Sequence, residues 1–180
     1  MVSALGHRGV PYGLIGRSAD VGYVTPHDPA GAAAIVAEIR RAQAGAGRAA
    51  EPLHVVADLV VFLGPDAAAA QGRRDRLDER AGQEYTSDAH VFAGTASQLA
   101  DLMLDWRPAG LSGFRLRPAV IPDDLEAITR DLVPELQRRG VFRTAYEAST
   151  LRGLLGLDRP ANRYATAGPA GPAAAGSGRN

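Results

Sequence analysis

Apolar positions along the chain change their spacing several times, from runs typical of strands to stripes typical of helices. Strand-like runs lie at residues 2–5, 20–24, 53–63 and 111–117. Each run is followed by a segment whose apolar residues lie three or four positions apart, which is the period of a helix. Alternation of this kind predicts an α/β fold in which four parallel strands are joined by crossover helices.

Several residues mark where the expected helices begin and end. Asp66 is placed to cap an Ala-rich helix, and Thr95 and Gln98 have the spacing of a capping box. Residues 82–90 are polar and predict a loop between these two helices. In the last helix Pro134 removes an amide donor, so we expect a kink or the start of a new helix there.

Composition and charge exclude several classes of function. Hydrophobic residues make up 46% of the 180 residues, the formal net charge is zero, and all 20 basic residues are Arg. We expect neither a nucleic acid nor a membrane as a partner, because both require a positive field on the protein. The absence of Cys excludes disulfides, thiolate metal sites and Cys nucleophiles, and four scattered His residues predict no metal site.

The two ends of the sequence differ in character. Residues 1–6 lack the charged start and apolar core of a signal peptide, so we expect a cytoplasmic protein. Residues 166–180 contain Ala, Gly, Pro and Ser but almost no large apolar side chain, and burial there cannot offset the entropy of ordering. The sequence therefore predicts one domain over residues 1–165, followed by a disordered tail.

The first expected strand ends in a loop with the chemistry of an anion site. Ligands bind at the carboxyl ends of parallel strands, because the loops there vary while the strands hold them in place. Here Gly6 and Gly9 flank His7 and Arg8 at the start of a helix. Free backbone amides, the positive end of a helix dipole and an Arg side chain all favour an anion. The alternative is a plain strand-to-helix turn with a solvated Arg.

The remaining His residues and one Asp have less specific surroundings. His27 follows the second strand and is a candidate to contact a ligand. Asp28 precedes Pro29, which is the pattern of a helix N-cap followed by Pro at the first position, and we favour the cap. We expect His54 to be structural, because it begins the third strand, and His90 to be a surface residue of the polar loop.

Two Arg residues project from one face of the last expected strand. Arg115 and Arg117 lie two positions apart, and side chains alternate between the faces of a strand. Asp58 lies inside the third strand, where a carboxylate is costly to bury without a partner. We therefore expect an ion pair between Asp58 and Arg115. Arg117 lies nearer the strand end and is a candidate to bind an anionic group of a substrate.

Four segments resemble, in their order, the C-terminal portion of a known family. They are VFAGT at 91–95, GFRLRP at 113–118, LVPELQRRG at 132–140 and RPANRYA at 159–165. The family is the luciferase-like flavin-dependent monooxygenases, in the branch that contains nitrilotriacetate and dibenzothiophene-sulfone monooxygenases. Barrels of this kind need about 250 residues even without insertions. The resemblance therefore implies that this chain forms the C-terminal half of a (β/α)8 TIM-type barrel.

The resemblance also implies a cofactor and its partners. Relatives in this family use O2 and reduced FMN, which a separate NADH-dependent flavin reductase supplies, to oxidise a small organic substrate. In the family a strand ending in a small-residue loop, followed by a helix and an Ala-Asp strand start, binds the FMN phosphate. Ala19 and Asp20 stand at the expected distance after residues 6–9, although His7 and Arg8 occupy places where many members carry two Ser.

Two functions of different class are compatible with the sequence. In the first, the chain is a component of an active monooxygenase, with FMN at residues 6–9 and substrate at His27 and Arg117. No catalytic residue is identified, because the flavin itself carries the oxygen chemistry. In the second, the chain is a truncated, inactive fragment or a non-catalytic half-barrel that only packs against a partner. Either way, two open strand edges favour self-association into a homo-oligomer.

Overall fold

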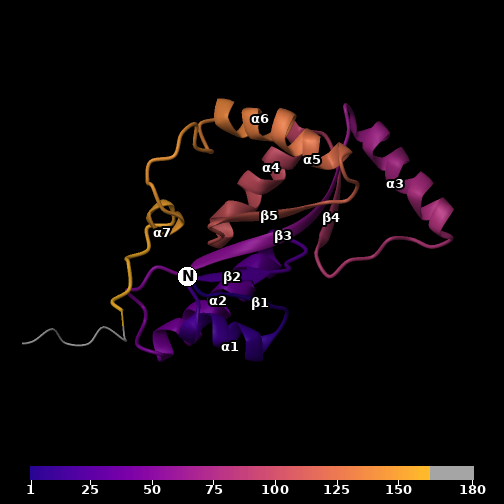
Figure 1. The fold of residues 1–180 in the computed structure, drawn as a ribbon. Helices are drawn as coiled ribbons and strands as arrows, with labels where there is room; N and C mark the ends of the chain where they lie inside the picture. Colours follow the sequence, from indigo (N-terminus) through magenta and orange to yellow (C-terminus); the bar gives the residue numbers. More distant parts are fainter. Residues whose placement is uncertain (163–180) are drawn as a thin grey trace, which may run out of the picture.

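The computed structural model describes residues 1–162, which form one sheet of five parallel strands with helices around it (Figure 1). The strands are β1 (Ser3–Gly6), β2 (Val21–Val24), β3 (His54–Leu63), β4 (His90–Gly94) and β5 (Gly113–Pro118). The helices are α1 (Gly9–Ser18), α2 (Pro29–Gly45), α3 (Ala67–Ala81), α4 (Ala96–Trp106), η1 (Arg107–Ala109), α5 (Asp123–Ala127), η2 (Ile128–Leu132), α6 (Val133–Arg138) and α7 (Leu151–Leu154). The predicted α/β fold is confirmed, and the predicted tail at 166–180 lies outside the described residues.

β3 is the longest strand and pairs with three others. β2 pairs with residues 54–57 of β3, β4 pairs with residues 59–63, and β5 pairs with residues 56–61. Because the register of β5 overlaps the other two, β2 and β4 lie end to end along one edge of β3, and β5 lies along the other edge. A strand with neighbours on both sides and cover on both faces suits the near-continuous apolar run in this segment.

β4 is a strand that the sequence did not predict. It occupies the edge of β3 beyond Ala57, where the pairing with β2 ends. Its five residues form a strand because β3 offers an unpaired edge there. Since β3 is distant in the sequence, the local pattern of residues does not indicate this pairing. The consequence for function is that the polar loop before β4 is brought close to the ends of β1 and β2.

The main hydrophobic core lies on one face of β3. Every second residue of this strand, from Val55 to Leu63, is almost fully buried and belongs to the same cluster as Ile15, Ile39 and Leu99 of the helices α1, α2 and α4. These helices therefore cover what we call the outer face of the sheet. The inner face carries the alternate residues Val56, Asp58, Val60 and Phe62, together with Arg115 and Arg117, whose β3 partners are Asp58 and Val60.

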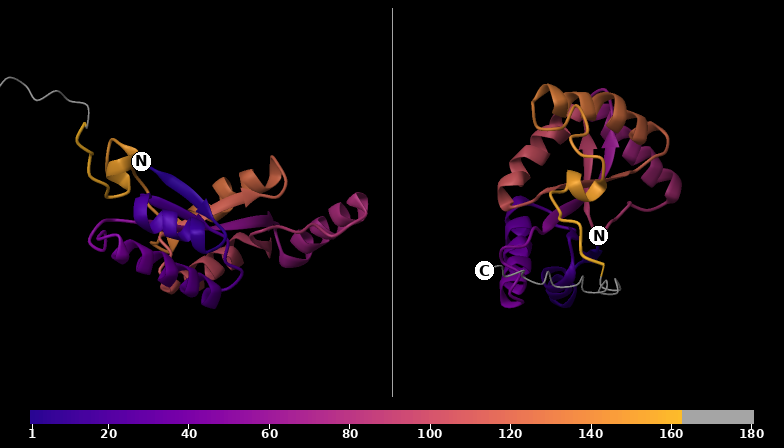
Figure 2. Two further views of the ribbon diagram at one scale, coloured as in Figure 1. Left: turned by 90° about the horizontal axis from the view of Figure 1, so that it is seen from below. Right: turned by 60° about the vertical axis from the view of Figure 1, so that its left-hand side comes forward.

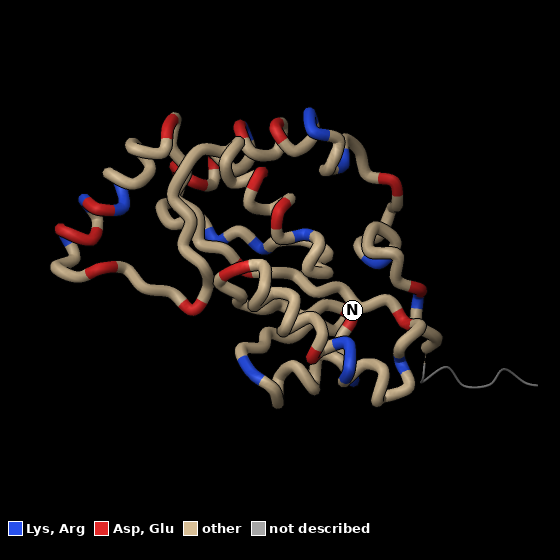
Figure 3. Tube along the Cα trace, turned by 180° about the vertical axis from the view of Figure 1, so that it is seen from behind, with Lys and Arg blue, Asp and Glu red and all other residues tan. Residues whose placement is uncertain are grey.

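The helix α3 differs from the helices that cover the outer face. Leu77 and Ala81 of α3 line a pocket together with Val60 and Phe62, so the end of α3 reaches the inner face. The rest of α3 extends away from the sheet (Figures 1 and 2). Arg and acidic residues are interspersed along it (Figure 3), and only Ala70 is buried. No helix within residues 1–162 is long and apolar enough to cross a membrane.

A buried carboxylate fastens α3 to the end of β3. Asp124 is fully buried, and its two carboxylate oxygens accept hydrogen bonds from the N–H groups of Leu63, at 2.7 Å, and Val120, at 2.8 Å. Arg73 of α3 forms an ion pair with the same carboxylate and also donates to the Leu63 carbonyl, at 2.9 Å. Three separate segments are therefore held together around one charge.

The predicted helix ends are confirmed. The Asp66 carboxylate accepts from Ala69 N–H at 2.8 Å, and Thr95 and Gln98 form the reciprocal bonds of a capping box. Pro134 is the second residue of α6, which begins at Val133 directly after the π-helical segment η2, so a new helix does begin beside this Pro. These features were predictable because each depends on residues only a few positions apart.

Three strands have one unpaired edge. Within the described part of the chain, β1 pairs only with β2, and β4 and β5 each pair only with β3. Exposed apolar side chains lie on or directly after two of these strands: Leu5 (43% exposed) on β1, Val10 (84%) and Leu14 (50%) on α1, and Ile121 (72%) after β5. Unpaired edges flanked by apolar side chains pair readily with another chain.

We therefore expect the isolated chain to self-associate. In sedimentation velocity at micromolar concentration it should run as a dimer or larger species, and Leu5→Glu should shift it toward monomer. The control Leu151→Glu changes a more exposed Leu on α7 (58%) and should have no such effect. A monomeric wild-type chain would show that these edges do not mediate self-association.

Candidate functional site

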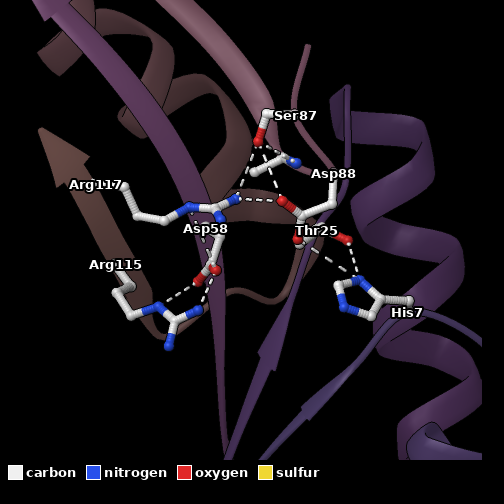
Figure 4. Close-up of polar contacts among 8 residues, drawn as sticks. His7, Thr25, Asp58, Ser87, Asp88, Arg115 and Arg117 are labelled. Atoms are coloured by element: carbon white, nitrogen blue, oxygen red, sulfur yellow. Dashed lines mark hydrogen bonds and ion pairs between the residues drawn. The ribbon is translucent and has the colours of Figure 1, made fainter. Parts of the chain in front are cut away.

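Polar side chains from several parts of the chain gather on the inner face, near the carboxyl ends of the strands (Figure 4). The end of β1 supplies His7, the end of β2 supplies Thr25, β3 supplies Asp58, the loop before β4 supplies Ser87 and Asp88, and β5 supplies Arg115 and Arg117. Parallel strands bring such residues together because all their carboxyl ends face the same way.

The predicted ion pair between Asp58 and Arg115 is confirmed. The two residues are direct partners in the register of β3 and β5, and Arg115 Nε donates to Asp58 Oδ1 at 2.8 Å. A second bond joins Arg115 Nη2 to Asp58 Oδ2, so the contact is bidentate. Hydrogen bonding to Asp58 raises the pKa of Arg115, whose guanidinium also lies 4.5 Å from the centre of the Tyr23 ring. The fully buried Asp58 carboxylate is thereby neutralised.

Arg117, the predicted substrate ligand, pairs with a carboxylate of its own chain. Arg117 Nη2 donates to Asp88 Oδ1 at 2.9 Å and to Ser87 Oγ at 3.3 Å. Arg117 Nε lies 3.9 Å from Asp58 Oδ2. The hydrogen bond from Arg117 is the main cause that lowers the pKa of Asp88. Both inner-face Arg residues are thus charge-balanced without any ligand.

Ser87 and Asp88 are residues that the sequence analysis missed. Besides Arg117, Asp88 also approaches His7: His7 Nδ1 lies 3.1 Å from Thr25 Oγ1 and 3.9 Å from Asp88 Oδ2. The loop before β4 therefore bridges the ends of β5 and β1. A single Asp in a polar loop carries no signal of this role, since only the pairing of β4 with β3 places it here.

The loop from Gly6 to Gly9 has the features predicted for an anion site. The first hydrogen bond of α1 joins Tyr12 N–H to the Arg8 carbonyl at 3.1 Å, so the N–H groups of Gly9 and Val10 have no acceptor within the helix. Arg8 is exposed, and its side chain makes no hydrogen bond or ion pair with residues 1–162. A Cβ at Gly6 would lie 2.9 Å from Tyr12 Cδ1, which explains why Gly is needed where the helix folds back on the strand.

The structure separates the other His residues from this cluster. His27 is exposed, whereas burial lowers the pKa of His90, and the charge of His27 adds to that effect. His90 is half-buried and lies 5.4 Å from the Trp106 ring, so the expectation of a surface residue was wrong: His90 begins β4 and faces the helices. His54 is structural as predicted, with Nε2 2.7 Å from the Leu155 carbonyl.

Asp28 caps α2 as predicted, with Oδ1 accepting from Gly31 N–H at 2.6 Å. His27, one residue earlier, has no contact with Arg117 in the structure, so the two predicted substrate ligands are not brought together. Among residues 1–162 no group of His, Asp or Glu side chains is arranged to hold a metal ion.

Parallel strands, helices on the outer face and polar residues at the carboxyl ends define part of a TIM-type β/α barrel. Solved structures of three enzymes share this fold. They are a long-chain alkane monooxygenase (TM-score 0.73, 21% identity), EDTA monooxygenase from Chelativorans sp. BNC1 (0.73, 24%) and riboflavin lyase with modified FMN and riboflavin (0.75, 18%). The matches cover 86%, 87% and 87% of this chain but only 44%, 49% and 47% of those chains.

Curated relatives carry closer sequence similarity over shorter segments. N-acetyl-S-(2-succino)cysteine monooxygenase of Bacillus subtilis is 42% identical over 96 residues, which are 51% of this chain and 22% of the relative. Nitrilotriacetate monooxygenase component A of Aminobacter aminovorans is 36% identical over 114 residues, which are 56% of this chain and 25% of the relative. Dibenzothiophene-sulfone monooxygenase of Rhodococcus erythropolis is 41% identical over 70 residues, which are 38% of this chain and 16% of the relative. No family model matches the chain.

The homologues of this chain are luciferase-like flavin-dependent monooxygenases, and the predicted resemblance is confirmed. The match is partial and corresponds to the C-terminal part of the barrel. The chain spans about half the length of the solved structures it matches, and its alignments cover a quarter or less of the curated relatives.

Proposed function

We propose that this chain supplies the C-terminal half of a barrel that uses reduced FMN and O2 to oxidise a small organic substrate. The observation that carries the proposal is the loop from Gly6 to Gly9. It lies at the carboxyl end of β1, it offers free amides and an Arg that has no partner among residues 1–162, and it precedes Ala19 and Asp20 at the spacing that the resemblance requires.

The residues of this loop fit the phosphate of FMN. The N–H groups of Gly9 and Val10 lie at the positive end of α1, and Arg8 adds a full charge with no competing partner in residues 1–162. His7, at the end of the same strand, is a further donor to an anion. With Arg8 and His7 in place of the two Ser of many relatives, the loop should hold the phosphate through the Arg8 charge as well as through hydrogen bonds.

The chain's own residues position and shield the cofactor. When bound, FMN supplies the redox and oxygen chemistry, so no acid or base of this chain is required. Asp88 and Ser87 hold the loop before β4 against Arg117 on the inner face. The substrate and the rest of the pocket lie, in our proposal, between this inner face and a second half-barrel that pairs with β1 and β5.

We propose a separate NADH-dependent flavin reductase as the source of reduced FMN. In support, two relatives are named as parts of larger systems: one is nitrilotriacetate monooxygenase component A, and the other belongs to pristinamycin IIA synthase of Streptomyces pristinaespiralis. The cytoplasm, where NADH is available, is the location that we propose for this reaction.

A comparison of FMN with riboflavin tests the proposal, because the two ligands differ only by the phosphate. In a fluorescence titration, FMN should bind at least tenfold more tightly, equivalent to about 1.4 kcal/mol. Both ligands should bind weakly in absolute terms, because half a pocket encloses little of the isoalloxazine ring. Equal affinity for FMN and riboflavin would show that the chain has no phosphate site.

A further inference from the structure

We infer that a pocket on the inner face binds a neutral, mainly apolar molecule of about two rings, and that the substrate of the proposed monooxygenase belongs to this class rather than to the polycarboxylates. Only the claim that this ligand is the substrate rests on the proposed function. The binding site itself is built by this chain alone, and it can be tested whether or not FMN binds.

The walls of the pocket are mainly apolar. It has a volume of about 260 Å³ and is lined on the sheet side by Val60, Phe62 and Pro118. On the other side lie Leu77 of α3 and Tyr85 of the loop that follows it. Apolar and aromatic walls of this kind bind ligands chiefly by removing apolar surface from water.

The volume sets the size of the ligand. An apolar cavity of about 150 Å³ accommodates one benzene ring. The pocket beside Arg117, at about 260 Å³, therefore has room for a compound of two fused rings. Tyr85 is 45% exposed, so its ring stands at the rim and is available for stacking on an aromatic ligand.

The charges of the pocket are already balanced. Arg117 and Asp78 are the two charged residues that line it. Arg117 is paired with Asp88, at 2.9 Å. Asp78 lies 3.7 Å from Arg74 and accepts a hydrogen bond from Tyr85 N–H at 2.9 Å. No net positive charge remains to compensate an anionic ligand.

A carboxylate ligand would therefore lose more free energy through desolvation than it gains from contacts in this pocket. At Arg117 it would share a guanidinium whose charge Asp88 already balances, and beside Asp78 it would be desolvated without a partner, which is costly for an ionised group. A neutral ring system pays no such penalty. The pocket thus suits a ligand unlike the polycarboxylates for which nitrilotriacetate and EDTA monooxygenases are named. It suits better the apolar compounds for which the relatives that act on dibenzothiophene sulfone and long-chain alkanes are named.

Two bicyclic probes that differ by one carboxylate test the inference directly. Indole, indole-2-carboxylate and nitrilotriacetate would each be titrated into the full chain by calorimetry and by saturation-transfer NMR. Indole should bind at least tenfold more tightly than indole-2-carboxylate, and nitrilotriacetate should not bind. Absence of indole binding, or equal or tighter binding of either anion, would overturn the inference.

Matched Trp substitutions on α3 locate the site. Ala81→Trp fills the pocket and should weaken indole binding at least tenfold, whereas Ala68→Trp, on the exposed first turn of the same helix, should leave it unchanged. Tyr85→Ser removes the aromatic wall without disturbing the core and should also weaken binding. If neither Ala81→Trp nor Tyr85→Ser affects indole, the pocket is not the site.

A third variant tests the role of charge balance. Asp88→Ala frees the Arg117 guanidinium, so indole-2-carboxylate should gain affinity and the preference for indole should shrink. An unchanged preference would show that the pairing of Arg117 does not set selectivity. FMN titration of Ala81→Trp keeps the two proposals apart, because this change lies outside the loop from Gly6 to Gly9 and should leave FMN affinity as it is.

Discussion

Replacement of Asp58 by Asn is expected to lower the free energy of unfolding by about 2 to 3 kcal/mol, below the roughly 3 to 5 kcal/mol typical of breaking a fully buried ion pair. The carboxylate is fully buried and is bidentately bound by Arg115, and Arg117 lies within 3.9 Å of it. The lower range applies because the side chains of Arg115 and Arg117 are 41% and 35% exposed, so water screens the charges that Asn leaves behind.

Chemical denaturation of the purified chain measures this effect. Glu79→Gln is a matched control: it makes the same change from acid to amide on the exposed surface of α3, and its side chain has no partner in residues 1–162. The control should stay within about 0.5 kcal/mol of the unaltered chain. If Asp58→Asn behaves like the control, the inner-face network does not stabilise the fold.

The same network explains why the inner face keeps its shape in the absence of a ligand. Asp58 holds Arg115, and Asp88 holds Arg117, so each guanidinium has a fixed position. Because Asp88 comes from the loop before β4, this loop is fixed as well. The pocket beside Arg117 is therefore preformed, which reduces the entropy cost of binding.

Much of the fold was predictable because its signals are local. The strands β1, β2, β3 and β5 follow from apolar runs, and Asp66, Thr95 and Gln98 cap helices through bonds to residues three positions away. The pair of Asp58 and Arg115 was also predictable, since a buried carboxylate in a strand requires a cation on the same face of a neighbouring strand.

The parts that were not predictable depend on contacts between distant segments. β4 forms because β3 has a free edge beyond Ala57. That pairing places His90 beside Trp106 and not on the surface. Asp88 joins the site for the same reason. Most of the candidate site therefore follows from strand ends and alternation, whereas the places of Ser87 and Asp88 follow from one strand that local propensity does not reveal.

If the loop from Gly6 to Gly9 holds the phosphate of FMN, as we propose, removal of the side chains of His7 and Arg8 should weaken FMN binding. The double variant His7→Ala/Arg8→Ala should bind FMN at least tenfold more weakly, a loss of about 1.4 kcal/mol, because a hydrogen bond to a charged group contributes roughly 1.5 to 3 kcal/mol and exposure reduces this. Its affinity for riboflavin should not change, since riboflavin has no phosphate.

Arg17→Ala is the matched control, because it removes an exposed Arg from the last turn of the same helix, α1. Fluorescence titration of the unaltered chain, the control and the double variant with FMN is the decisive measurement. We expect that only the double variant loses FMN affinity. Full FMN affinity in the double variant, or an equal loss in the control, would contradict it.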